Sequence, residues 1–371
     1  MSRVLLQALL WIAFALSAAC EKNSAPELDV SMLLGNDSVD GYQRAIEARE
    51  FSFPADHGAH NGFRNEWWYF TGNLKDDRGH VFGYQVTFFR IALSPERLER
   101  QSAWAGNQVW MAHVALSDID ARRHSHAQRF ARGANGLAGA EENPLRVWLE
   151  DWQVSAADGE GFPWTINVQS DAFSLDLVLN ADKAPVLQGD KGLSRKSAEP
   201  GNASYYYSIT RMSTHGTISQ AGERFEVTGQ SWLDREWSTS ALSAEQAGWD
   251  WFSLQLDDGR DLMFYRLRNT SGEADVYSAG TLVKVDGDYT TLSRDDVSLE
   301  VMDTWRSTTG KDYPVAWKLT LRGEPDSWIV RAAFEDQEMQ TAVNYWEGAV
   351  EVSNATTGES LGRGYLELTG Y

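Results

Sequence analysis

The chain has 371 residues and a formal net charge of −20, from 53 acidic and 33 basic side chains. This negative field repels phosphate backbones, so the composition argues against a nucleic-acid partner. The single cysteine excludes an internal disulfide, and its position near the start leaves the rest of the chain without a thiol catalyst. A chain of this length suits two domains better than one.

The first residues have the features of an export signal. Arg3 gives a positive start, residues 4–16 form an apolar run interrupted only by Gln7, and three small residues precede Cys20. The run is shorter than the ~20 residues of a membrane-spanning helix. This order is typical of a secretory signal peptide, which we place at residues 1–19. A plain cleaved signal is the alternative, but the segment resembles a lipobox, and we predict that Cys20 carries a lipid.

The segment after the signal is predicted to be a tether. Residues 20–45 are polar and rich in turn formers, which suits a lipidated N-terminus that connects the lipid to the fold. Glu21, and not aspartate, follows the cysteine, and by resemblance to sorted lipoproteins this favours the outer membrane. We therefore expect a periplasm-facing lipoprotein of the bacterial cell envelope, held at the membrane by the Cys20 lipid alone.

The rest of the chain is predicted to be all-β. Helical periodicity is weak, and the best short candidates are residues 95–101 and 241–246. The 16 Trp, 13 Tyr and 15 Phe either fill a β core or line a cavity for a flat apolar ligand, and both roles are open. Alternating segments rich in aromatic and β-branched residues recur between turn residues at 67–74, 81–89, 173–179, 225–229, 251–256 and 262–267.

An internal repeat divides this body into two units. Residues 67–74 (WWYFTGNL) and 249–256 (WDWFSLQL) share one pattern, and each precedes an Asp-Gly hairpin turn and a second apolar strand. The units also end alike, with FEVTG at 225–229 and LELTG at 366–370. Because the first and last strands of a closed sheet pair, matched ends suit two β-barrels in tandem. We place these barrels at residues 46–233 and 234–371.

Several motifs resemble those of the hydroxyneurosporene-synthase-like, or AttH-like, proteins. They are NEWWYFTG at 65–72, SWLDREWS at 231–238, YWEGAV at 345–350 and GYLELTGY at 364–371. The resemblance implies two lipocalin-like (calycin) antiparallel β-barrels, in agreement with the repeat. The best-known enzymes of this family are carotenoid 1,2-hydratases, and other members are lipoproteins often encoded beside a MacB/LolC-like ABC exporter.

The hydratase resemblance implies one set of site residues. Protonating an isoprene double bond needs a carboxylic acid kept neutral in an apolar pocket. The motif match places this function on Asp234, Trp237 and Tyr265, with Glu236 as a second acid and Arg235 where the hydratases have histidine. An arginine does not exchange protons near neutral pH, and it holds nearby carboxylates ionised. The interpretation that the sequence favours is an ion-pair cluster of residues 234–236 that fixes the angle between the barrels.

Aromatic residues give a second set of candidates. Trp67, Tyr69, Trp249 and Trp251 are predicted to contact a ligand, with a filled barrel floor as the alternative. His113 lies in an apolar strand and is either a pocket residue or a hydrogen-bonded interior histidine.

No metal or cofactor site is predicted. His57 and His60 have a spacing that suits a metal, but no third ligand is evident and a loop is the preferred interpretation. Glu66 is expected to be the buried partner of an arginine, and a pocket acid is the alternative. The chain has no nucleophile elbow, phosphate loop or dinucleotide fingerprint.

Three functions therefore remain open. The one that the sequence favours is a membrane-tethered protein that binds or carries a hydrophobic, isoprenoid or lipid-like ligand, with an ABC exporter as a candidate partner. The second is a hydro-lyase of the carotenoid 1,2-hydratase type, and the third is a structural envelope partner with filled barrels. A cavity that ends in a buried carboxyl near Asp234 or Tyr265 favours the enzyme, whereas a cavity without a protonatable acid favours the binder.

Overall fold

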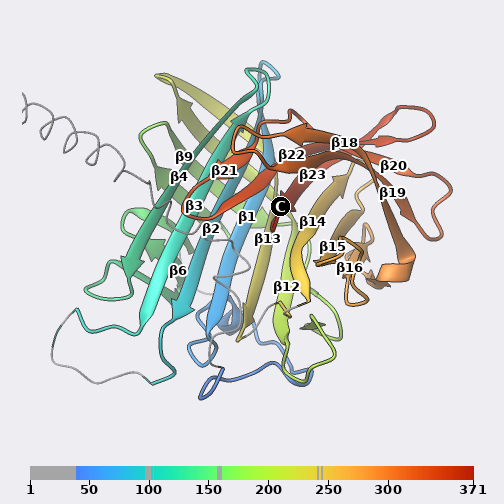
Figure 1. The fold of residues 1–371 in the computed structure, drawn as a ribbon. Helices are drawn as coiled ribbons and strands as arrows, with labels where there is room; N and C mark the ends of the chain where they lie inside the picture. Colours follow the sequence, from blue (N-terminus) through green and yellow to red (C-terminus); the bar gives the residue numbers. More distant parts are fainter. Residues whose placement is uncertain (1–38, 97–101, 103, 157–160, 240–241, 244) are drawn as a thin grey trace, which may run out of the picture.

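The structure is a computed structural model that describes residues 39–96, 102, 104–156, 161–239, 242–243 and 245–371. These residues form two curled antiparallel sheets that lie side by side, with the C-terminus near their junction (Figure 1). Helical structure in the described residues is limited to the short 3₁₀ turns η1 (Ala55–His57) and η2 (Arg294–Asp296). The part of the chain that is described contains no helix long and apolar enough to cross a bilayer.

Some of the sequence predictions concern residues that the structure does not describe. The signal peptide and Cys20 lie outside the described ranges, as do residues 97–101, 241 and 244 of the two candidate helices. Leu242 and Ser243 are not helical, and Gln246 begins a strand, so no helix is seen in the described part of 241–246.

The first sheet has the strand order β4-β3-β2-β1-β13-β12-β9-β8-β7-β6-β5, and β10 and β11 also pair with β12. Its strands are β1 (Asn65–Asp76), β2 (Val81–Ala92), β3 (Gln108–Asp118), β4 (Arg123–Arg132), β5 (Ala138–Glu142), β6 (Leu145–Leu149), β7 (Trp152–Ala156), β8 (Trp164–Gln169), β9 (Phe173–Ala181), β10 (Val186–Leu187), β11 (Leu193–Arg195), β12 (Ala203–Gln220) and β13 (Glu223–Ser238).

The second sheet has the order β17-β16-β15-β14-β23-β22-β20-β19-β18, and β21 pairs with β22. Its strands are β14 (Gln246–Leu256), β15 (Asp261–Asn269), β16 (Ala279–Val283), β17 (Tyr289–Ser293), β18 (Val297–Arg306), β19 (Asp312–Leu321), β20 (Trp328–Ala332), β21 (Glu338–Gln340), β22 (Asn344–Asn354) and β23 (Ser360–Leu368).

The two ends of each repeat unit pair with one another, which confirms the tandem-barrel prediction. β1 lies against β13 from Asn65↔Ser238 to Asp76↔Val227, and β14 lies against β23 from Asp250↔Leu368 onward. Each sheet thereby curls into a near-barrel that stays open between two strands consecutive in the chain, β4 and β5 or β17 and β18. The fold is all-β, with two lipocalin-like barrels in tandem.

The strand pairing moves the boundary between the barrels. We predicted that the second barrel begins at residue 234, but β13 continues to Ser238 and pairs there with both β1 and β12. Closure of the first barrel requires this full strand length opposite β1. Residues 234–238 therefore belong to the first sheet, and the second begins with β14 at Gln246.

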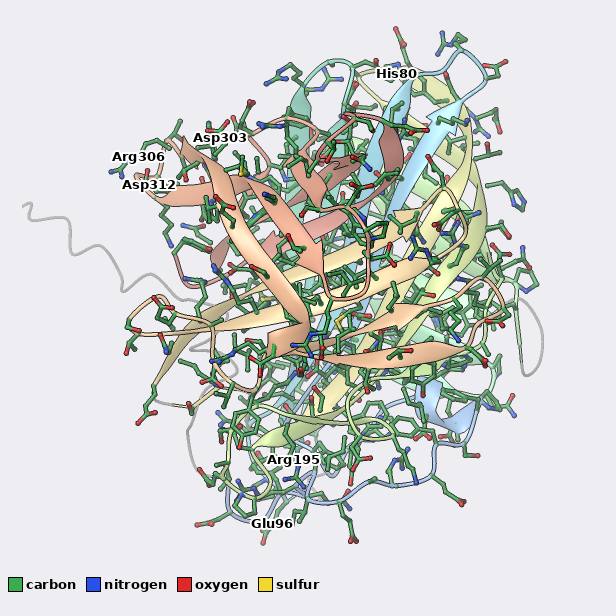
Figure 2. All side chains as sticks on the ribbon, turned by 90° about the vertical axis from the view of Figure 1, so that its right-hand side faces the viewer. His80, Glu96, Arg195, Asp303, Arg306 and Asp312 are labelled. Carbon is green, nitrogen blue, oxygen red and sulfur yellow. The ribbon has the colours of Figure 1, made fainter. Side chains whose placement is uncertain are left out.

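Inward and outward residues alternate along each strand, so every second side chain points into a barrel. These side chains form the two cores. Trp68, Phe70 and Phe82 belong to the first core, and Phe252 and Trp317 to the second. The ion pair Arg306–Asp312 is exposed at the outer edge of the second barrel (Figure 2).

The outer faces of the two sheets are buried against each other. Asp261, at the start of β15, is fully buried and accepts hydrogen bonds from Lys183 Nζ at 2.7 Å and Arg211 Nη2 at 2.6 Å, both from the first barrel. A third apolar cluster lies in this interface and includes Tyr69 and Trp251.

Candidate functional site

A pocket lies between the outer faces of the two sheets, and not within either barrel. The non-atom space in it, including its open mouth, is about 760 Å³. It is lined by Trp67, Tyr69, Phe89, Lys196, Tyr206, Asp234, Glu236, Leu242, Trp249, Trp251, Tyr265, Leu267, Tyr345 and Glu367.

Asp234 on β13 is the most enclosed acid of this lining, with 3% of its surface exposed. Its carboxyl accepts hydrogen bonds from Ser208 Oγ at 2.5 Å, from Trp232 Nε1 at 2.7 Å and from the Tyr206 hydroxyl. Burial raises the pKa of Asp234 to about 7, although these three donors lower it. Near neutral pH this carboxyl therefore holds a proton for part of the time, as a general acid must.

Glu367 on β23 is the second pocket acid. It accepts a hydrogen bond from the Trp249 indole nitrogen at 2.6 Å. Burial raises the pKa of Glu367 to about 7, and the charges of Asp234 and Glu236 raise it further. Two carboxyls from different barrels thus titrate in the same range, so near neutral pH each of them holds a proton for part of the time.

Glu236 on β13 is the third acid of the lining, and its partner is a lysine. Lys196 Nζ lies 3.1 Å from its carboxyl, and the Ser204 hydroxyl donates to it. Burial alone would lower the pKa of Lys196, but the Glu236 carboxylate raises it above its ordinary value. The ammonium also lies 4.2 Å from the centre of the Tyr265 ring, whose hydroxyl is hydrogen-bonded to Ser194 at 2.8 Å. This ion pair gives the pocket a fixed polar end.

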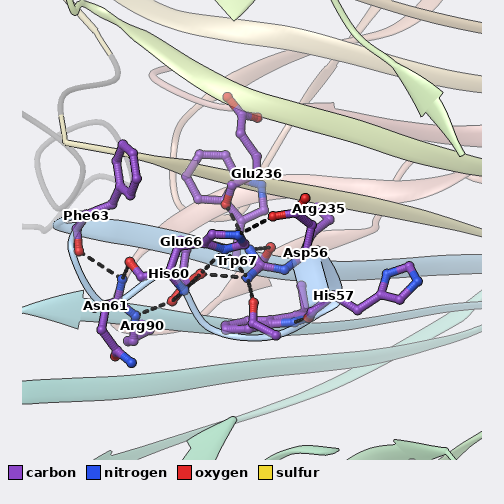
Figure 3. Close-up of polar contacts among 12 residues, drawn as sticks. Asp56, His57, His60, Asn61, Phe63, Glu66, Trp67, Arg90, Arg235 and Glu236 are labelled. Carbon is purple, nitrogen blue, oxygen red and sulfur yellow. Dashed lines mark hydrogen bonds and ion pairs between the residues drawn. The ribbon is translucent and has the colours of Figure 1, made fainter. Parts of the chain in front are cut away.

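Arg235 does not take part in the pocket. Its side chain enters the first barrel, where it bonds to Glu66 Oε2 at 2.6 Å and lies 3.8 Å from the centre of the Trp68 ring (Figure 3). Glu236 points away from this inner cluster (Figure 3). The predicted ion-pair cluster of residues 234–236 between the barrels is therefore wrong, because neighbours on a strand face opposite sides of the sheet.

Glu66 lies at the centre of that inner cluster. It is a buried partner of arginine, as the sequence predicts. Arg90 and Arg235 both bind its fully enclosed carboxyl. Burial would raise the pKa of Glu66, but the two guanidinium groups hold it well below its usual range. His60 also contacts Glu66, with Nδ1 3.3 Å from Oε2, and its Nε2 lies 3.0 Å from Asp56. His60 therefore belongs to an ion-pair network, whereas His57 bonds to the Tyr207 hydroxyl, and the described residues contain no cluster suited to a metal ion.

The structure brings most of the predicted site residues together. Asp234, Glu236, Tyr265, Trp67, Tyr69, Trp249 and Trp251 all line the pocket.

Two predicted residues lie elsewhere. Trp237 points into the first barrel and stacks on the His60 ring, with 3.7 Å between ring centroids, because it shares the inward face of β13 with Arg235. His113 is fully buried behind the pocket wall, where Nδ1 lies 2.9 Å from the Tyr345 hydroxyl. Burial lowers the pKa of His113 to about 3, so the ring is neutral.

Sequence reasoning missed Glu367, Lys196 and Tyr206. Glu367 lies within the GYLELTGY motif and alternates with core residues of β23, so the motif held a usable signal. Lys196 directly follows the short strand β11, and nothing in the local sequence indicates that it reaches the second barrel.

Comparisons with known proteins agree with this architecture. A model of the AttH-like family matches residues 44–371. A Nitrosomonas europaea protein whose crystal structure is described as that of an AttH is 37% identical, with a TM-score of 0.79 over 89% of this chain and 99% of that one. Kievitone hydratase from Nectria haematococca shares the fold at 13% identity, with a TM-score of 0.65 over 89% of this chain and 98% of its own. No curated protein sequence matches significantly.

Proposed function

The chain belongs to the AttH-like family, and from its pocket we propose that it is an acid–base enzyme of the hydro-lyase type. It would add water to, or remove water from, an apolar unsaturated small molecule held between the barrels. The observation that carries this proposal is the buried carboxyl of Asp234, whose pKa is raised to about 7 at an aromatic-walled pocket. A protein that only carries an apolar ligand has no need of such an acid.

The proposed chemistry assigns the two carboxyls opposite roles. In the direction of addition, the Asp234 proton passes to one alkene carbon, and the π electrons form the new C–H bond. The cation left on the other carbon is stabilised by the faces of Trp67, Trp249 and Trp251. Water oxygen bonds to that carbon and loses a proton to the Glu367 carboxylate. Return of this proton from Glu367 to Asp234 restores the starting state, and the reverse sequence removes water.

The fixed pair Lys196–Glu236 and the Tyr265 hydroxyl suit a polar group on the substrate, such as a hydroxyl or carbonyl. The indole and phenol walls suit its apolar, flat part. The substrate class is therefore an isoprenoid-like alkene that has at least one oxygen function.

We also propose the cellular setting that the N-terminal sequence indicates. The Cys20 lipid would hold the protein at the bacterial envelope, facing the periplasm, and the family resemblance points to an ABC exporter as a partner. An apolar substrate partitions into membranes, so a membrane-tethered enzyme would meet it at a high local concentration.

The decisive experiment is an untargeted search for hydration. The full-length protein is incubated with an apolar extract of its native host in water enriched in oxygen-18, and products are examined by mass spectrometry. We expect some compounds to gain or exchange one labelled oxygen with the wild-type protein and not with Asp234→Asn. Asp118→Asn is the matched control, because Asp118 is also 3% exposed but bonds to His80 and Arg123 outside the pocket.

Two results would contradict the proposal. If Asp234→Asn labels the same compounds as the wild type, Asp234 is not the acid. If an apolar molecule copurifies in stoichiometric amount and is never labelled, the carrier function is the better account.

A further inference from the structure

A row of polar residues crosses the outer face of the first sheet at one register. Ser208, Asp234, Tyr69, Thr87 and His113 are successive cross-strand partners on β12, β13, β1, β2 and β3. All five are buried, with exposed fractions from 0% to 5%. The pocket acid is therefore one end of a buried polar row, and its direct neighbour in that row is Tyr69.

The second barrel covers this row with more polar side chains. Tyr345 on β22 bonds to His113 of the row, and Glu347 on β22 interacts electrostatically with Tyr69 of the row and with Tyr365 on β23. The hydroxyls of Tyr69 and Tyr345 lie close enough to the Glu347 carboxyl to lower its pKa, although burial raises that pKa by more. Both tyrosines also line the pocket, so Glu347 is directly behind the pocket wall.

Many polar atoms of this layer lack a protein partner. Within the described residues, no hydrogen bond of ordinary length and angle reaches the hydroxyls of Tyr69 and Tyr365, Nε2 of His113 or either carboxyl oxygen of Glu347. Glu347 and Tyr365 are each only 1% exposed. Buried polar atoms without partners cost free energy, and they gather where a small polar ligand satisfies them.

The chemistry of the layer selects the ligand. Burial raises the pKa of Glu347 well above its ordinary value, which favours the neutral carboxyl and weakens its attraction for a cation. The imidazole of His113 is also neutral. The layer thus offers neutral groups that both donate and accept hydrogen bonds and has no net charge, which matches water.

We propose that Tyr69, His113, Tyr345, Glu347 and Tyr365 form a water-binding chamber that supplies the pocket with the water of the reaction. The inference that this water reacts rests on the proposed function. The inference that water is bound in the chamber does not. Water leaving the chamber would pass between the Tyr69 and Tyr345 hydroxyls, beside the Asp234 carboxyl. Glu347 is then a positioning residue, because it orients water and does not itself contact the substrate.

Hydroxyl-radical labelling by a short X-ray pulse tests the chamber without any substrate, since bound water generates radicals beside buried side chains. We expect Tyr69 and Tyr365 of the full-length protein to be oxidised several-fold faster than Tyr207. Tyr207 is the matched control because it is 0% exposed and its hydroxyl is paired with His57 Nδ1 at 2.6 Å inside the first barrel.

Variants at Glu347 sharpen the test. Glu347→Gln keeps hydrogen-bonding groups and should keep the labelling, whereas Glu347→Leu should reduce it at Tyr69 and Tyr365 while Tyr207 stays protected. Equal protection of Tyr69, Tyr365 and Tyr207 in the wild type would overturn the chamber, whether or not the protein hydrates alkenes. Labelled tyrosines together with no Asp234-dependent hydration would instead overturn the proposed function alone.

Discussion

Asp234 and Arg235 are adjacent in the chain, yet their side chains lie on opposite faces of β13 and belong to different sites. Asp234 faces the second barrel and the pocket, whereas Arg235 is bound to Glu66 in the first barrel. The guanidinium therefore does not hold the Asp234 carboxyl ionised, and burial sets the pKa of Asp234 at about 7. The substitution of arginine for histidine in this motif leaves an acid in the pocket.

The Asp234→Asn variant should change how stability depends on pH. Burial raises the pKa of Asp234 from 3.8 to about 7, so between these values the folded protein binds a proton that the unfolded chain has lost. This contribution is fully present below about pH 4 and is lost as pH rises through about 7. Asparagine does not ionise. Between about pH 4 and pH 7, the unfolding free energy of the wild type should therefore fall relative to that of the variant by about 1.4 kcal/mol per pH unit. A parallel pH dependence of the two proteins would contradict the shifted pKa.

The Lys196–Glu236 pair should show strong coupling in a double-mutant cycle. Lys196→Met leaves a buried carboxylate with only the Ser204 hydroxyl, and Glu236→Gln leaves a buried ammonium. Each single change should cost about 3–5 kcal/mol in denaturant unfolding. The double variant should lose less than the sum of the two, and additive losses would show that the pair is not coupled.

Replacing Arg235 should destabilise the first barrel without altering the pocket acid. Arg235→Met leaves Glu66 with Arg90 as its only remaining arginine partner, so we expect a loss of about 3–5 kcal/mol by denaturant unfolding. The exposed Arg195 serves as the control, since Arg195→Met should change stability by no more than about 0.5 kcal/mol. The Arg235→His variant should add labelled oxygen from oxygen-18 water to the same compounds as the wild type, with the same dependence of the rate on pH. A shifted pH dependence would place residue 235 in the reaction.

Asp261 should couple the unfolding of the two barrels. Its buried carboxyl bonds to Lys183, Arg211 and Thr210 of the first barrel. Asp261→Asn weakens these contacts across the interface, and scanning calorimetry should show the single transition broaden or split. Asp258, on the same hairpin, bonds only to Arg260 within the hairpin and is the control. An unchanged transition in Asp261→Asn would show that apolar packing alone joins the barrels.

Cys20→Ser tests the proposed anchor. The thioether attachment requires the cysteine sulfur, so this variant should lose incorporation of labelled palmitate in cells and move from the membrane to the soluble fraction. Retention in the membrane fraction without lipid labelling would instead indicate an uncleaved signal segment or a protein partner.

The alternation of the strands and the repeat of their ends were sufficient to predict the architecture. The motifs around Trp67 and Trp249 predicted paired hairpins, and the matched ends near Phe225 and Leu366 predicted closure of each unit. These features are local and periodic, so a single sequence displays them.

The boundary between the barrels and the site between them could not be obtained in this way. Alternation along β13 shows that Asp234 and Arg235 face opposite sides, but not which side the second barrel covers. Lys196 and Glu367 come together with Asp234 only because two outer sheet faces pack on each other. The sequence by itself determined the strands, their pairing into two barrels and the export signal that we predict. The tertiary structure decided which face became the pocket, because the burial that raises the pKa values of Asp234 and Glu367 exists only when the barrels are in contact.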